Sequence, residues 1–133
     1  MLVRIFAAIV VLSPVYGGLA QDGAPKYEET LVKLVDTLGQ MTKTLEMIVD
    51  EDSGKAQQAA LRGQAEMFIA TRKQSEALAP PSAEEREKLA RNFRPQFEKL
   101  RKELVGQIAR VQRVPGGNLV LQEIRGVFEK SMP

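Results

Sequence analysis

The feature that most constrains the fold is a heptad pattern of apolar residues in the first third of the chain. Seven apolar residues recur there in alternating steps of four and three: Tyr27, Leu31, Leu34, Leu38, Met41, Leu45 and Ile48. This spacing places one continuous apolar stripe along an α-helix. The pattern therefore predicts a helix over residues 26–49 whose stripe must be covered by neighbouring helices.

Turn-forming residues divide the rest of the chain into three further predicted helices, over 54–79, from Ser82 to about Arg113, and over 119–130. We expect Asp52 or Ser53 to cap the first of these and Asn118 the last. Ser82 and Glu85 have the spacing of a capping box, which favours a helix start after Pro80-Pro81. Pro95 lies inside the third pattern and predicts a kink near 92–95.

The second helix is expected to pack through small residues. Its predicted inward stripe consists of Ala56, Ala60, Gly63, Met67, Ala70 and then Ala77 or Leu78, with Leu61, Phe68 and Ile69 beside it. No run alternates with period two, so strands are not expected. The predicted fold class is all-α: an antiparallel helical bundle of three long helices plus one short C-terminal helix, spanning residues 26–133.

The first 20 residues are typical of a secretory signal peptide. Arg4 precedes an unbroken apolar run over 5–12, and Gly18-Leu19-Ala20 provides small residues for cleavage. The run is far shorter than the roughly 20 residues of a membrane-spanning helix. We expect a signal peptide over 1–20, a flexible leader over 21–25, and an exported protein, periplasmic or extracellular, with no transmembrane span after signal removal. Residues 15–17 offer a weaker cleavage site, and a retained segment would form an apolar tether.

The residue types that the chain lacks exclude several kinds of catalytic and metal-binding site. The chain contains no Cys and no His, so it has no thiolate nucleophile and lacks the commonest general base and metal ligand. We therefore expect no cofactor, no metal and no catalytic residues. The acidic turn Asp50-Glu51-Asp52 could attract a hard cation, but it does not match a calcium loop. Turn and capping chemistry is the preferred interpretation of that turn.

Charge is unevenly distributed along the chain. Residues 22–52 hold 8 acidic and 3 basic side chains, a net −5, whereas residues 80–113 hold 5 acidic and 9 basic ones, a net +4. The basic stretch is the candidate surface for an anionic partner, and its members are Arg86, Arg91, Arg94, Lys99, Arg101, Lys102, Arg110 and Arg113. Export argues against nucleic acid and favours lipid headgroups or an acidic protein. The competing interpretation is a solvated outer face with its own Glu partners.

The ensemble of turns and caps resembles a group of small exported helical proteins of planctomycete-like bacteria. The resemblance rests on Met41, Ile48, the segment 50–55, the segment 80–85 and the charged helix after it. It implies an exported helical fold and no particular activity. Cytochrome c′-type proteins are similar in size and export route, but their haem-attachment motif and His ligand are absent here.

The function expected from these features is that of a cofactor-free binding or structural module of the cell envelope, not an enzyme. Its partner would be a protein or an envelope surface. The alternatives are a periplasmic chaperone-like protein, suggested by the methionines and the basic third helix, and a carboxylate-based enzyme. Self-association into a homodimer would bury apolar surface that the short last helix leaves uncovered.

Overall fold

The computed structural model describes residues 23–131, and they form four α-helices without a strand. The helices are α2 (Gly23–Glu46), α3 (Glu51–Ala77), α4 (Ala83–Gln112) and α5 (Gly117–Ser131). The all-α prediction is thus confirmed for these residues. The predicted signal peptide, 1–20, lies outside them. No helix within 23–131 has the length and apolar character needed to cross a membrane.

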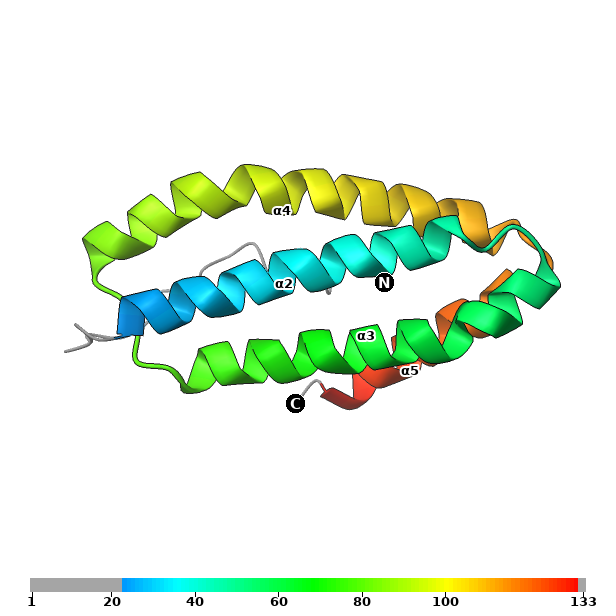
Figure 1. Ribbon diagram of the computed structural model, residues 1–133, viewed down its shortest axis with the longest axis horizontal. Helices are drawn as coiled ribbons and strands as arrows, with labels where there is room; N and C mark the ends of the chain where they lie inside the picture. Colours follow the sequence, from blue (N-terminus) through cyan, green and yellow to red (C-terminus); the bar gives the residue numbers. More distant parts are fainter. Residues whose placement is uncertain (1–22, 132–133) are drawn as a thin grey trace.

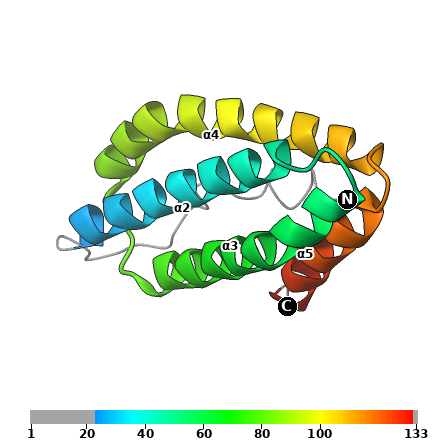
Figure 2. The ribbon, with the colours of Figure 1, turned by 45° about the vertical axis from the view of Figure 1, so that its right-hand side comes forward.

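The central helix of the fold is α2, which lies between α3 and α4 in both views (Figures 1 and 2). The shorter helix α5 contacts α3 and α4. The predicted heptad stripe is confirmed from Leu31 to Ile48: its six members there are at most 4% exposed, and Tyr27 is half-buried. They share one hydrophobic core with apolar side chains of the other three helices.

Helix α2 begins at Gly23, so residues 23–25 of the predicted flexible leader are helical. Pro25 does not prevent this, because the first four N–H groups of a helix have no intrahelical partner. The helix ends at Glu46, three residues before the predicted end. The backbone N–H groups of Val49 and Asp50 donate instead to the Ser53 hydroxyl, at 2.9 and 3.0 Å, and this bonding pattern terminates the helix.

The predicted inward stripe of α3 is wrong. Its small residues and Met67 are exposed, whereas Leu61, Ala65, Phe68 and Ile69 are buried. These four residues also have helical spacing, and three of them carry large apolar side chains that gain more from burial than alanine does. The helix therefore packs through its larger residues and presents its alanine-rich face outward.

The prediction for the third helix, from Ser82 to about Arg113, fits the structure more closely than that for the second. Helix α4 begins after Ser82, whose hydroxyl accepts a hydrogen bond from the Glu85 N–H at 3.3 Å, and it continues through Pro95 without a break. Both views show α4 as a bowed helix (Figures 1 and 2). Its buried apolar side chains include Leu89, Phe93 and Phe97.

The predicted cap of the last helix is wrong, because α5 begins at Gly117 and Asn118 lies inside it. Gly116 adopts a positive φ of 77°, which turns the chain between α4 and α5. Gly117 then lies so close to α4 that a Cβ at this position would overlap the Val111 carbonyl oxygen. The lack of a side chain at both positions allows α5 to start one residue before Asn118.

Two glycines in helices give opposite predictions for substitution by alanine. Gly117→Ala should destabilise the protein by about 1–3 kcal/mol, because the added methyl group has no room beside Val111. Gly63→Ala should stabilise it by about 0.5–1 kcal/mol, because its Cβ would meet nothing within 4 Å in the exposed middle of α3. Urea denaturation of both variants measures the change. Equal effects of the two substitutions would contradict this packing of the α4–α5 turn.

Candidate functional site

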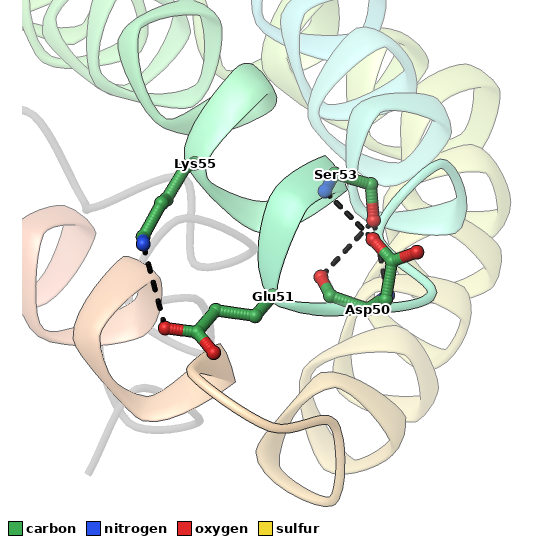
Figure 3. A network of polar contacts seen from close by, with 4 residues as sticks. All are labelled: Asp50, Glu51, Ser53 and Lys55. Carbon is green, nitrogen blue, oxygen red and sulfur yellow. Dashed lines mark hydrogen bonds and ion pairs between the residues drawn. The ribbon is translucent and has the colours of Figure 1, made fainter.

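A surface hollow of about 350 Å³ lies where the first turns of α3 meet the start of α5. It is lined by Glu51, Lys55, Gln58, Gly116, Leu119, Val120, Gln122 and Glu123. Figure 3 shows Glu51 and Lys55 pointing from α3 toward the start of α5, with their charged groups 3.5 Å apart. The hollow therefore combines two carboxylates, one ammonium group and two amides with apolar surface.

The first turn of α3 is held by a capping box. The Ser53 N–H donates to the Asp50 Oδ1 at 2.7 Å, and the Ser53 hydroxyl accepts from the Asp50 N–H (Figure 3). The N-cap is thus Asp50, two or three residues before the predicted caps Asp52 and Ser53. The capping interpretation of the acidic turn is confirmed, with Glu51 and Asp52 in the first turn, where acids suit the helix dipole. Among residues 23–131, no group of three acidic side chains is arranged to hold a metal ion.

The turn between α4 and α5 packs directly on this capped start. The backbone of Gly116 comes so close to Glu51 that a Cβ on the glycine would lie 3.0 Å from the Glu51 Cγ. Val120 of α5 lies over Gly54, where a Cβ would meet the valine side chain at 3.4 Å. The walls of the hollow are therefore fixed by close backbone packing.

Exposed apolar side chains accompany the hollow at this end of the protein. Leu119 is 63% exposed on its wall, and Met47 and Val49 of the α2–α3 connection are 59% and 67% exposed. Val32 and Met67 are the other large apolar residues exposed among the described ones. We refer to Met47, Val49 and Leu119, together with the hollow, as the end surface.

The structure distributes the predicted basic residues of α4 over different environments. Exposed members of the set are Arg91, Arg94, Lys99, Lys102 and Arg113, whereas Arg86, Arg101 and Arg110 are partly buried. Arg91 forms an ion pair with Glu87 at 3.7 Å. Arg86 lies near the phenol of Tyr27: burial raises the pKa of Tyr27 above its ordinary value, and the positive charge of Arg86 opposes that shift.

Arg110 binds the protein's own backbone. Its Nη1 donates to the Ile48 carbonyl at 2.8 Å and its Nη2 to the Leu45 carbonyl at 2.6 Å, while Nε donates to the Gln107 side chain. Carbonyls at the end of a helix lack intrahelical donors and carry partial negative charge. The guanidinium binds the Leu45 carbonyl in the last turn of α2, which also accepts from the Ile48 N–H at 3.1 Å, and the Ile48 carbonyl in the connection that follows. Arg110 therefore differs from the exposed cations of the predicted surface.

No family model, curated protein or solved structure matches this chain. The candidate site therefore rests on the residues and geometry described above.

Sequence reasoning did not identify the hollow. Its walls come from residues 51–58 and 116–123, which are far apart in the sequence and share no periodic pattern. A weak local signal existed in Leu119, an apolar residue directly beside the predicted cap Asn118. Arg110 gave no such signal, because its carbonyl partners lie 62 and 65 residues away.

The cap of α3 should make stability depend on pH in the acid range. Hydrogen bonds from Ser53, first through its side chain and then through its backbone, hold the pKa of Asp50 below its ordinary value. The cap therefore stabilises the fold above the unfolded-state pKa of about 4 and is lost as the pH falls through the lower folded-state pKa. Asp50→Ala should lower the free energy of unfolding at pH 7, and its difference from wild type should shrink toward pH 2.

Urea denaturation across this pH range measures the effect. Asp36→Ala, on the exposed part of α2, is the control and should change stability little at any of these pH values. A difference between Asp50→Ala and wild type that stays constant from pH 7 to pH 2 would contradict the role of the ionised cap.

Arg110→Met should destabilise the protein by about 1–3 kcal/mol, because it leaves the Leu45 and Ile48 carbonyls without their charged donor. Arg110→Lys should restore only part of the loss, since one ammonium group lacks the forked geometry of guanidinium. Arg94→Met, an exposed position on the same helix, is the matched control and should stay within about 0.5 kcal/mol of wild type. Thermal and urea unfolding measure the stability of all three variants. Equal losses of stability in Arg110→Met and Arg94→Met would refute the role of the hydrogen bonds from Arg110.

Proposed function

We propose that this protein is an exported, cofactor-free helical bundle that acts as a binding module in the cell envelope, without catalysis of its own. The observation that carries the proposal is the end surface. Among the residues that the structure describes, three of the five exposed large apolar side chains lie in the α2–α3 connection and at the start of α5, at the end of the fold that carries the hollow. Exposed apolar side chains that gather beside a polar rim are typical of interaction sites.

The proposed arrangement is an antiparallel bundle of three long helices and one short C-terminal helix. Arg110, near the end of α4, donates a hydrogen bond to the Ile48 carbonyl just after the end of α2. Arg86, near the start of α4, lies close enough to Tyr27, near the start of α2, for its charge to oppose the rise in the pKa of Tyr27 that burial causes. These contacts support α2 and α4 running in the same direction. Helix α3, which follows α2 in the chain, would then run in the opposite direction to both. The arrangement would bring both loops of the end surface together at one end.

The proposal of export rests on the sequence of residues 1–20. Protein purified from the exporting cell should begin at Gln21, which mass spectrometry of the native N-terminus measures. The same preparation serves for the binding experiment, so that location and binding are tested on one molecule.

Immobilised protein should capture specific components of the envelope fraction, and the triple variant Met47→Ser, Val49→Ser and Leu119→Ser should capture them at least about fivefold less. This loss corresponds to about 1 kcal/mol of binding free energy, which the three truncated apolar side chains are expected to contribute together. Quantitative mass spectrometry of the captured proteins measures it.

The matched control is the double variant Val32→Ser and Met67→Ser, which removes the two large exposed apolar residues that the described part of the chain holds outside the end surface. It should capture as much as wild type. Circular dichroism checks that both variants keep their helices. Equal capture by the triple variant and wild type, or equal loss in the control, would refute the end surface as the binding site.

A further inference from the structure

The walls of the hollow carry more acidic than basic groups. Glu51 and Glu123 line it together with one cation, Lys55, which pairs with Glu51. Among the side chains that the structure describes, no ammonium or guanidinium lies within 4.0 Å of the Glu123 carboxylate. The hollow itself therefore holds an excess of negative charge.

The surroundings increase this excess. Asp50 and Asp52 are exposed and adjoin Glu51 in the sequence, so they add two carboxylates to the same end of the fold. The partial positive charge of the α3 N-terminus is already met by its own acidic first turn. Counted with Glu51 and Glu123, these acids outnumber the exposed cations that the structure describes at the same end, Lys55 and Arg113.

The same hollow offers an apolar contact. Leu119 is mostly exposed on its wall and Val120 is buried beneath it, while Gln58 and Gln122 supply amide groups. A matching ligand needs an aliphatic group for Leu119 and positive charge for Glu51 and Glu123. Small metal ions lack the aliphatic group, and nucleic acids lack the positive charge.

We propose that the hollow binds a cationic segment of another protein, in which lysine or arginine side chains flank an aliphatic one. The proposal rests on the proposed binding function and names its partner by chemistry. The aliphatic side chain packs on Leu119, and the flanking cations lie against Glu51 and Glu123. Complementary charge also raises the rate at which such a partner associates.

A second copy of this chain fits the hollow less well. Its basic side chains on α4, including Arg94, Lys99 and Lys102, are exposed, but none of the exposed large apolar residues among the described ones lies on α4. That face could supply the charge without the aliphatic group that Leu119 requires. The charge and apolar character of the hollow together favour a different protein.

The test is fluorescence anisotropy with two labelled hexapeptides, one alternating lysine and leucine and one alternating glutamate and leucine. The protein should bind the lysine peptide and not the glutamate peptide. The double variant Glu51→Gln and Glu123→Gln should weaken this binding by about threefold to tenfold, the range expected for two partly solvated charge pairs. Leu119→Ser should weaken it similarly, and added salt should weaken binding to wild type.

The control is the double variant Glu66→Gln and Glu129→Gln, which removes one carboxylate from each of the same two helices and breaks their i,i+4 pairs with Arg62 and Arg125. It should bind the lysine peptide like wild type. Equal loss in this control, equal binding of both peptides, or wild-type binding by Glu51→Gln with Glu123→Gln would overturn the proposal. So would a concentration-dependent dimer in sedimentation that Leu119→Ser abolishes, because a second copy would then be the occupant.

The envelope experiment separates this inference from the proposed function. If the triple serine variant loses envelope capture while the Glu51→Gln and Glu123→Gln variant retains it, the end surface binds a partner, but that partner is not a cationic segment. If neither variant changes capture, the proposed function fails as well.

Discussion

The burial of α2 on two sides is the constraint on which the rest of the structure depends. Because α2 contacts both α3 and α4, it buries more than its heptad stripe: Thr30, Thr37, Thr42 and Thr44 are also buried. Each threonine hydroxyl donates to a carbonyl three or four residues earlier in the same helix. These bonds satisfy the hydroxyls internally, so a wide face of α2 can be buried without an orphaned polar group.

The end of α2 depends on two independent groups. Ser53 accepts hydrogen bonds from backbone N–H groups just after the helix, and Arg110 donates to carbonyls at its end. One group comes from the next helix and the other from α4, so the α2–α3 connection is tied to two neighbours. This explains how a four-residue connection can hold Met47 and Val49 in exposed positions without ordering them through apolar burial.

The predictions from sequence succeeded where one local pattern determines the structure. They failed where two sets of residues in the same segment could take the same role. The α2 stripe and the start of α4 follow from heptad spacing and from Ser82 after two prolines, and both were predicted. The inward face of α3 was not, because its small residues and its larger residues both have helical spacing, and only packing against α2 and α5 selects between them. Both Asp50 and Asp52 are residue types that can cap α3. Asp50 is the N-cap because its carboxylate accepts the hydrogen bond from the Ser53 N–H. The hollow depends on contacts between α3 and α5 that no local pattern contains.

The end surface separates stability from binding in a useful way. Its structure is held by backbone and capping bonds, such as the Val49 N–H to Ser53 and the Leu119 N–H to the Gly116 carbonyl, and not by the exposed side chains of Val49 and Leu119. Those side chains can therefore change with little effect on the fold, whereas a partner meets them on a backbone that is already ordered. Pre-ordering of this kind lowers the conformational cost of association. It also means that loss of binding in serine variants of these residues reports on the contact itself, because the bonds that position them remain.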